Sequence, residues 1–335
     1  MSEAAPGTIL ARFRRGVIGG LALGVLLYVG YALWVGADEV LDALIGFQWA
    51  WLPILLLLSL ANYAIRFARW EWLLRALEIR IPLGSSIAIF LAGLAMTLTP
   101  GKVGEFLKSY LLKRRHGVPM ATSAPVVFAE RVADLLSLVL LASFGVASLG
   151  AAAGAAPVLG VAAGTVLALL VTLRSKRLSA VLLRLVARLP RGERIAERGS
   201  EALNASRALL APWPLLVGVG LGAVAWFCEC MGYWLAFRGF GVEGMRAAVA
   251  VFAYAFSTVA GVVTPGGIGP TDIGLIELAR PFTPGLRNEV ATAASFLVRV
   301  CTLWFAVALG ALALLRFRNL VDVDVEVARG GGTDA

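Results

Sequence analysis

Two short segments combine threonine, proline and glycine within apolar surroundings, a combination that suits binding of an anion, and the first also carries Lys102 and Glu105. They are residues 99–105, Thr-Pro-Gly-Lys-Val-Gly-Glu, and residues 264–269, Thr-Pro-Gly-Gly-Ile-Gly. Each should break a helix, because proline lacks a backbone donor and glycine permits unusual dihedral angles. A helix that restarts after such a break points backbone N–H groups and a positive dipole end at the break, which suits a phosphate or carboxylate. A proline-kinked helix, with glycines serving close packing, is the alternative.

Ionisable residues also lie deep within apolar runs, where they are costly and normally face a cavity or one another. Glu130, Arg131 and Asp134 fall in one such run, and Glu130 and Asp134 share a helix face. Arg131 can reach Asp134 three residues on, so an internal ion pair is the alternative to a substrate role. Arg299 occupies a comparable depth in a later run. This correspondence favours a polar cavity shared by two similar units.

Other charged residues divide between the cavity and the membrane interface. Glu229 lies roughly where Arg66 lies in the earlier unit, whereas we expect Arg69 to extend its charge to the interface. Residues such as Glu277 and Lys108, on the helices after the breaks, can line the cavity or face the interface. The candidate substrate-binding residues are Arg66, Gly101, Lys102, Glu105, Glu130, Arg131, Asp134, Glu229, Gly266, Gly267, Asp272, Glu277 and Arg299.

No pattern in the sequence indicates catalysis or a cofactor. The three cysteines, Cys228, Cys230 and Cys301, and the single histidine, His116, do not form a zinc or haem motif. No nucleophile–base pair is evident, and the second glycine motif lacks the Gly-Lys-Ser/Thr ending of a nucleotide-binding loop. We therefore expect no enzymatic activity, no catalytic residue, no metal and no cofactor.

The composition is that of an integral membrane protein. Of 335 residues 59% are hydrophobic and 15% charged, and the mean hydropathy is +0.84, outside the range of soluble domains. The net charge of +9 comes from Arg and Lys at the ends of apolar runs, which fits anionic lipid headgroups and not nucleic acid.

The apolar runs predict an all-α bundle with six crossings, at about 17–35, 49–69, 121–149, 157–173, 213–237 and 289–315. Two further pairs of limbs are too short to cross: 84–99 with 102–112, and 247–263 with the helix that begins at Pro270. Each pair is predicted to be a re-entrant hairpin, the first entered from the cytoplasm and the second from outside. The two units are then an inverted-topology repeat, the architecture of secondary transporters.

Charge distribution sets the predicted orientation. Arg12, Arg14 and Arg15 precede the first run and Asp38 and Glu39 follow it, which places both termini in the cytoplasm of a multi-pass inner-membrane protein. A single membrane domain, 1–320, comprises repeat one (about 49–150), a basic amphipathic linker on the inner leaflet (174–208) and repeat two (about 213–316). The Gly-rich tail, 321–335, is predicted to be disordered.

Taken together, these motifs resemble the lysylphosphatidylglycerol synthase transmembrane, or flippase-like, family. The resemblance runs from about Trp49 to Arg316 and rests on Arg-x-x-Arg-Trp at 66–70, Glu-Arg-x-x-Asp at 130–134 and the two Thr-Pro-Gly segments. The family includes the N-terminal flippase half of the multiple peptide resistance factor, whose C-terminal domain makes aminoacylated phosphatidylglycerol. That synthase domain is absent here. The resemblance implies a flippase without aminoacyl transfer, acting on an aminoacylated, anionic or sugar-linked lipid. In the second motif Asp272 lies further from the glycines than the family's acidic residue, so its role is left open.

The first hypothesis is therefore a flippase that carries a phospholipid or lipid-linked headgroup through a midplane polar cavity while the acyl chains stay in the bilayer. A secondary transporter of a small soluble anion would use the same fold but a cavity closed to lipid, and a membrane scaffold is the third reading. The expected partners are phospholipids with anionic or aminoacylated headgroups. A separate lipid-synthesising enzyme and self-association into a homo-oligomer are left open.

Overall fold

The structure is a computed structural model that describes residues 36–99, 104–149 and 192–316, with single positions at 26, 29–30, 33–34, 160, 163–164, 168 and 171. The predicted crossings 17–35 and 157–173 fall mostly outside the described residues. The tip residues 100–103, the linker up to residue 191 and the tail 321–335 lie wholly outside them. Every regular element within the described residues is a helix, which confirms an all-α protein.

Four helical segments are long and apolar enough to cross a membrane, as the sequence predicted for these regions. They are Trp49–Ala76, made of η1 (Trp49–Trp51) and α3 (Leu52–Ala76); α6 (Met120–Leu149); α10 (Pro212–Gly239); and Asn288–Arg316. The last consists of α13 (Asn288–Arg299), the π-helical segment η6 (Val300–Trp304) and α14 (Phe305–Arg316). Large apolar side chains on these helices face outward, among them Leu57, Leu140, Leu216 and Leu312.

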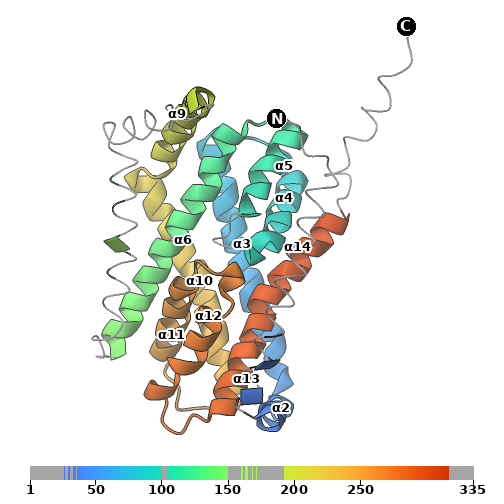
Figure 1. The fold of residues 1–335 in the computed structure, drawn as a ribbon, viewed down its shortest axis with the longest axis vertical. Coiled ribbons are helices and arrows are strands. Elements are labelled where there is room, and N and C mark those ends of the chain that lie inside the picture. The colour runs from blue at the N-terminus through green and yellow to red at the C-terminus, as the bar shows by residue number, and fades with distance from the viewer. Residues whose placement is uncertain are drawn as a thin grey trace.

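Between the long helices of each half lie short helices separated by a break. The first half has α4 (Leu83–Ala95), η2 (Met96–Leu98) and α5 (Leu107–His116). The second has α11 (Ala247–Ala260), η4 (Pro265–Gly267), α12 (Pro270–Glu277) and η5 (Arg280–Phe282). In Figure 1, α4 and α5 lie in the upper half of the molecule, and α11 and α12 lie in the lower half. Both helix breaks predicted from the Thr-Pro-Gly segments are therefore present, although the opposed membrane orientation of the two units stays a prediction.

One limb begins later than the sequence suggested. Helix α5 starts at Leu107, after a 3-10 turn at 104–106, and not at Lys102. Two further helices complete the described fold: α2 (Ala37–Ile45), at the lower end of the molecule, and α9 (Gly192–Leu209), which packs against α6 and forms the last part of the predicted linker.

The two halves contact each other through corresponding pairs of helices. Helix α3 packs on α10, and the closing helix of each half packs on the first short helix of the other, α6 on α11 and α14 on α4. A glycine permits close approach at both exchanged contacts. A Cβ on Gly145 of α6 would lie 2.7 Å from the Phe252 nitrogen, and one on Gly310 of α14 would lie 2.4 Å from the Ala95 nitrogen. Small residues at these positions let the backbones touch, as is common between membrane helices.

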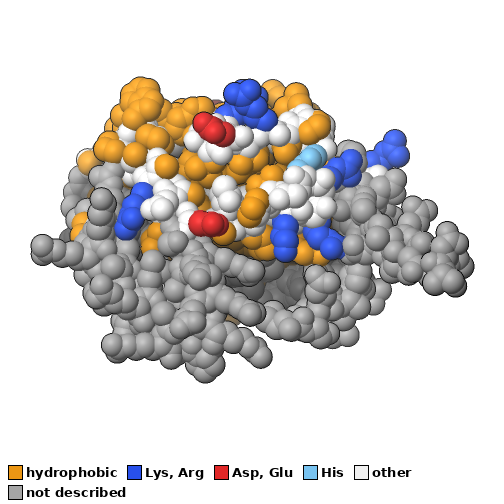
Figure 2. Space-filling model, turned by 90° about the horizontal axis from the view of Figure 1, so that it is seen from above, with side chains coloured by type: hydrophobic (Ala, Val, Ile, Leu, Met, Phe, Trp, Pro, Cys, Tyr) orange, Lys and Arg blue, Asp and Glu red, His pale blue; other side chains and the backbone are white. Residues whose placement is uncertain are grey.

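The two ends of the molecule differ in charge. Figure 2 looks at the end where α3 and α5 finish and shows Lys and Arg side chains around it, among which Arg75, Arg80, Lys113, Arg114 and Arg115 are exposed. Burial, and then the neighbouring Arg115 charge, lower the pKa of His116, so this side chain is neutral at pH 7 and the positive charge comes from Lys and Arg. At the opposite end, the first turn of α2 carries exposed Asp38 and Glu39.

Cysteine labelling tests the predicted orientation. In a background without Cys228, Cys230 and Cys301, a cysteine at Arg115 should react with a membrane-impermeant maleimide only from the cytoplasmic side, and one at Asn288 only from outside. Asn288 is exposed, whereas the nearby Phe282 is partly buried against Phe252 and would report poorly. If both cysteines react from the same side, the predicted inverted repeat is wrong.

Candidate functional site

A cavity of about 250 Å³ lies between the two halves of the protein. Its walls come from α3, α6, α10 and α11, from the break between α11 and α12, and from the junction of α13 with η6. Seven of the thirteen predicted site residues line it: Arg66, Arg131, Asp134, Glu229, Gly266, Gly267 and Arg299. The structure thus brings together residues that are more than 200 positions apart in the sequence.

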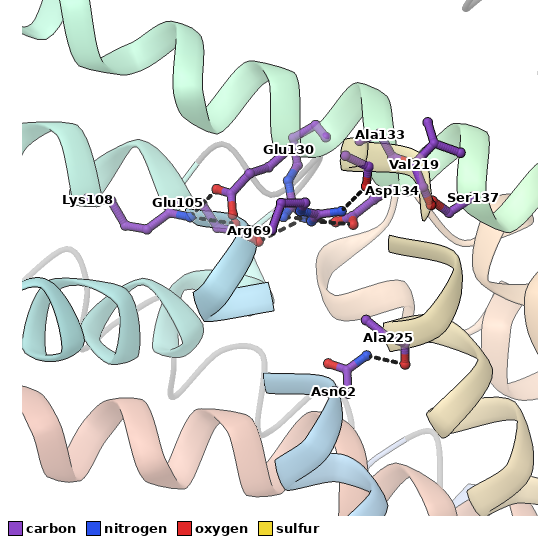
Figure 3. Close-up of polar contacts among 12 residues, drawn as sticks. Asn62, Arg69, Glu105, Lys108, Glu130, Ala133, Asp134, Ser137, Val219 and Ala225 are labelled. Atoms are coloured by element: carbon purple, nitrogen blue, oxygen red, sulfur yellow. Dashed lines mark hydrogen bonds and ion pairs between the residues drawn. The ribbon is translucent and has the colours of Figure 1, made fainter. Parts of the chain in front are cut away.

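One wall of the cavity is part of an ion cluster, which we define as Arg69, Glu105, Lys108, Glu130, Arg131 and Asp134 (Figure 3, where all but Arg131 are labelled). Arg131 and Asp134 line the cavity, and the other four lie behind them. Arg131 lies 3.2 Å from Glu105 and 2.9 Å from Asp134, so the internal ion pair that the sequence offered as an alternative to a substrate role is present. Lys108 lies 2.5 Å from Glu130 and 3.8 Å from Glu105. With three cations and three carboxylates, the cluster is neutral, which meets the requirement that charges buried at this depth be paired.

Lys108 is held by apolar contacts as well as by charge. Its ammonium lies 4.5 Å from the centre of the Trp70 ring, within cation–π range. Its methylene stem packs over Gly93 of α4, where an added Cβ would lie 2.7 Å from the Lys108 Cγ. Glu105 and Lys108 therefore lie in the protein interior, and they neither line the cavity nor face the membrane interface, the two alternatives that the sequence left open. They fix α5 against α4 and α6.

The expectation for Arg69 was wrong. The residue is fully buried, and its guanidinium donates to Asp134 at 2.6 Å and to the Gly218 carbonyl of α10 at 3.3 Å. A Cβ on Gly222 would lie 2.7 Å from the Arg69 Nη1, so this glycine of α10 makes room for the guanidinium. Interior partners on two other helices explain why the side chain does not reach the interface.

In the second half, Arg299 and Asp272 form the corresponding buried pair. The Arg299 Nε lies 2.8 Å from Asp272 Oδ1, and its Nη2 donates to the Gly266 carbonyl at 2.5 Å. The other Asp272 oxygen accepts from the Gly269 N–H at 2.9 Å, at the start of α12. Asp272 is the third residue of α12, and its carboxylate caps the start of this helix. The sequence had suggested a substrate anion for this position, which the Asp272 side chain occupies instead.

Arg66 differs from the other two cavity arginines. It is 7% exposed and lines the cavity, and its Nε has no hydrogen-bond partner. Among the ion pairs and hydrogen bonds of the described residues, none involves Arg66, whereas Arg131 and Arg299 are both paired with carboxylates. An arginine buried without a carboxylate is costly, and an anion in the cavity would offset that cost.

Polar groups that the sequence did not single out complete the walls. Tyr63 donates to the Thr302 carbonyl at 2.5 Å, and Tyr254 donates to Glu229 at 2.8 Å. Both tyrosines line the cavity. The only sequence signal for them is an aromatic hydroxyl within an apolar run, which requires a buried partner. Asn62 of α3 donates to the Ala225 carbonyl at 2.8 Å and ties α3 to α10.

The remaining predicted residues lie elsewhere. Glu105 and Glu130 do not line the cavity and stand behind it in the ion cluster. Glu277 does not line it either; it pairs with Arg280 at 3.0 Å, and both side chains are substantially exposed. Gly101 and Lys102 lie outside the described residues. Within the described chain, no group of His, Cys, Asp or Glu side chains could hold a metal ion.

Gly266 offers a test of the second break. Its φ of +60° favours glycine, and an added Cβ would lie 3.0 Å from a Leu98 methyl and 3.3 Å from Leu303. Gly266→Ala should therefore slow the lipid transport that the sequence predicts, measured in proteoliposomes, because the cavity wall must shift. Gly241→Ala is the matched control, since Gly241 has a φ of +75° and open space around it. Each change should cost about 1 kcal/mol of stability, but only Gly266→Ala should slow transport. Equal transport in the two variants would show that Gly266 contributes to folding and not to transport.

Comparisons with known proteins agree with the membrane architecture. A family model described as the lysylphosphatidylglycerol synthase TM region matches residues 20–310. Two relatives from Methanothermobacter thermautotrophicus, both named UPF0104 membrane protein, are 25% identical, one over 87% of this chain and 90% of its own length, the other over 90% and 95%. Glycosyltransferase AglD of Haloferax volcanii is 28% identical over 41% of this chain and 22% of its own length. No solved structure matches.

Proposed function

This chain belongs to the family of the lysylphosphatidylglycerol synthase TM region, and from that premise we propose that it is a lipid flippase. The headgroup of a phospholipid or lipid-linked sugar passes through the central cavity while the acyl chains remain in the bilayer. The function is transport and not catalysis. The name of the glycosyltransferase relative supports including sugar-linked lipids among the candidates.

The observation that carries this proposal is Arg66, a buried cation that faces the cavity and has no carboxylate partner among the described residues. The phosphate of a lipid headgroup is an anion that cannot enter hydrocarbon at a useful rate without a partner charge. A guanidinium can donate two parallel hydrogen bonds to such a phosphate. Arg66 is thus available to a ligand, while the pairs of Arg131 and Arg299 hold the walls in place.

The mouth of the cavity favours a lipid over a small soluble anion. Val262 lines the cavity and is itself 41% exposed, and the neighbouring Val263 is 73% exposed. Both lie in the break between α11 and α12, halfway along the molecule in Figure 1. An apolar opening at this level would meet acyl chains in a bilayer. A lipid could therefore keep its chains outside while its headgroup occupies the cavity.

The membrane setting belongs to the same proposal. The basic end in Figure 2 faces the cytoplasm of the cell inner membrane, in keeping with the excess of Lys and Arg on cytoplasmic surfaces. The α4–α5 hairpin enters from that side and the α11–α12 hairpin from the other, and the two hairpins meet where η2 contacts η4. That arrangement is an inverted repeat with its site at the midplane. A separate enzyme would supply the lipid.

A leaflet-accessibility assay tests the proposal. Purified protein is placed in phosphatidylcholine vesicles that contain a trace of an acyl-labelled fluorescent lipid, and the fraction quenched by external dithionite is followed with time. The panel comprises phosphatidylglycerol, lysylphosphatidylglycerol, phosphatidylethanolamine and a lipid-linked sugar phosphate. Protein should accelerate exchange of at least one phosphate-bearing lipid over protein-free vesicles. Equal rates with and without protein for the whole panel would refute the proposal.

A further inference from the structure

Most hydroxyl groups on the cavity wall donate their hydrogen to the protein itself. Among the described residues that line the cavity, six carry a hydroxyl, and four of these donate it to a backbone carbonyl: Tyr63 to Thr302 at 2.5 Å, Thr258 to Tyr254 at 2.7 Å, Thr271 to Ser257 at 3.1 Å and Thr302 to Val298 at 2.8 Å. A carbonyl cannot donate, so the direction of these four bonds is fixed. Towards a ligand, each of these hydroxyl oxygens can act only as an acceptor.

Such a wall favours a ligand that brings hydrogen-bond donors of its own. The oxygens of a phosphodiester are acceptors, which suit the Arg66 guanidinium but cannot bond to an oxygen that only accepts. The hydroxyls of glycerol or a sugar do carry donors. An ammonium donates as well, but it would add a positive charge beside Arg66, which has no carboxylate partner among the described residues. The wall therefore matches a headgroup that joins a phosphate to an uncharged polyol.

The volume of the cavity limits the size of that polyol. At ~30 Å³ for each water molecule, a cavity of 250 Å³ holds about eight waters. Pockets that enclose drug-sized ligands measure roughly 300–1,000 Å³, so this cavity suits a smaller group, such as one phosphate with one glycerol or one sugar ring. A longer headgroup would extend through the mouth at Val262 and Val263 into hydrocarbon, where its hydroxyls would lack partners at a high cost.

We propose that the cavity is specific for a phosphodiester headgroup with one small, uncharged polyol, whose phosphate binds Arg66 and whose hydroxyl donates to Thr258. Thr258 is partly exposed, whereas Tyr63, Thr271 and Thr302 are buried, so its oxygen is the most open acceptor of the four. The inference rests on the proposed function, because it needs a headgroup in this cavity, and it names the class of that headgroup. Glycerol, inositol and a single hexose belong to the class. Ethanolamine and a pyrophosphate with a sugar chain do not.

Phosphatidylglycerol and phosphatidylpropanol are the matched probes, since both are singly charged and similar in size but only the first carries free hydroxyls. Each is added as a trace of acyl-labelled fluorescent lipid to phosphatidylcholine vesicles that contain the intact protein, and exchange is followed by dithionite quenching. Phosphatidylglycerol should exchange about tenfold faster, the order expected for one or two uncharged hydrogen bonds. Phosphatidylinositol should behave like phosphatidylglycerol. Phosphatidylethanolamine and a lipid pyrophosphate disaccharide should exchange no faster than phosphatidylpropanol.

Thr258→Val keeps the shape of the side chain and removes the acceptor, so it should lower the rate for phosphatidylglycerol to nearly that of phosphatidylpropanol. Thr292→Val is the matched control. Thr292 also donates to the carbonyl four residues earlier, that of Asn288 at 2.8 Å, but it is fully buried outside the cavity. This control should keep the native preference, and the two variants should have similar thermal midpoints. Tyr63→Phe is a second cavity variant that should also reduce the preference, and it guards against a folding defect in the first.

The outcomes separate this inference from the proposed function. Equal exchange of phosphatidylglycerol and phosphatidylpropanol by the native protein would overturn the polyol specificity and leave the flippase intact. Native preference in both Thr258→Val and Tyr63→Phe would overturn it as well, and so would exchange of phosphatidylethanolamine or the disaccharide lipid as fast as phosphatidylglycerol. Absence of accelerated exchange for every phosphate-bearing lipid would instead refute the proposed function.

Discussion

Arg66→Gln is expected to slow headgroup exchange roughly 100-fold while leaving the protein at least as stable as before. Loss of a charge-assisted contact to a phosphate in a desolvated site costs about 3 kcal/mol, and each 1.4 kcal/mol is tenfold in rate. Stability should not fall, because Arg66 lines the cavity without a carboxylate partner in the described chain and its Nε is unsatisfied. The measurements are the dithionite assay and the thermal midpoint in detergent.

Arg69, one turn further along α3, is the matched control. It is also buried, but it is held by Asp134 and the Gly218 carbonyl. Arg69→Gln leaves the Asp134 carboxylate with one cation fewer in a dry site and should lower stability by about 3 kcal/mol. Arg66→Gln should thus lose transport and keep its stability, whereas Arg69→Gln should lose stability. If Arg66→Gln lowers the thermal midpoint as much as Arg69→Gln and keeps its exchange rate, Arg66 is a structural residue and the anion site is misplaced.

Lys108→Met should be among the most destabilising single changes in the ion cluster, at about 3–5 kcal/mol. Methionine preserves the apolar stem against Trp70 and Phe90 but strands the Glu130 carboxylate, which is fully buried and 2.5 Å from the lysine. The thermal midpoint of the purified protein is the measurement.

The rescue variant Lys108→Met/Glu130→Gln tests the cause of that loss. Removing the stranded charge should restore most of the lost stability, because the cost lies in an uncompensated buried carboxylate and not in the missing attraction. A double variant as unstable as the single one would show that the Lys108 packing, and not its charge, holds α5 in place. Transport by the rescued protein would then separate the structural cluster from the cavity residues.

The structural features that the sequence predicted best are those that depend on one helix alone. The length of the apolar runs located the four long helices, and the Thr-Pro-Gly segments located both breaks, because proline and glycine act on their own backbone. The partners of the buried charged residues were harder to predict. Arg131 with Asp134 could be predicted because the two lie three residues apart on one helix, whereas Arg69 with Asp134 depends on how α3 and α6 are rotated against each other.

The same dependence on helix packing explains why the ion pair of the second half was not predicted. Asp272 could be recognised as an acidic residue near a helix start, but its capture by Arg299, 27 residues away, depends on tertiary packing. The late start of α5 at Leu107 also had no strong local signal. Residues in the Gly-rich stretch before it are compatible with either a helix or an irregular turn. Helices and helix breaks can thus be predicted from the local sequence, whereas the partners of buried charged residues cannot.

The π-helical segment Val300–Trp304 constrains the length of the last span. A π turn accommodates one residue more than an α turn, and each residue of an α-helix turns the chain by about 100°. This segment therefore sets the angular offset between Arg299, which faces the cavity, and α14, which packs on α4. It also includes the Thr302 carbonyl that accepts the Tyr63 hydroxyl. Deletion of one residue here would regularise the helix and rotate Arg299 by about a quarter turn relative to α14. Relatives that keep the arginine in the cavity should therefore tolerate substitutions in this span but not changes in its length.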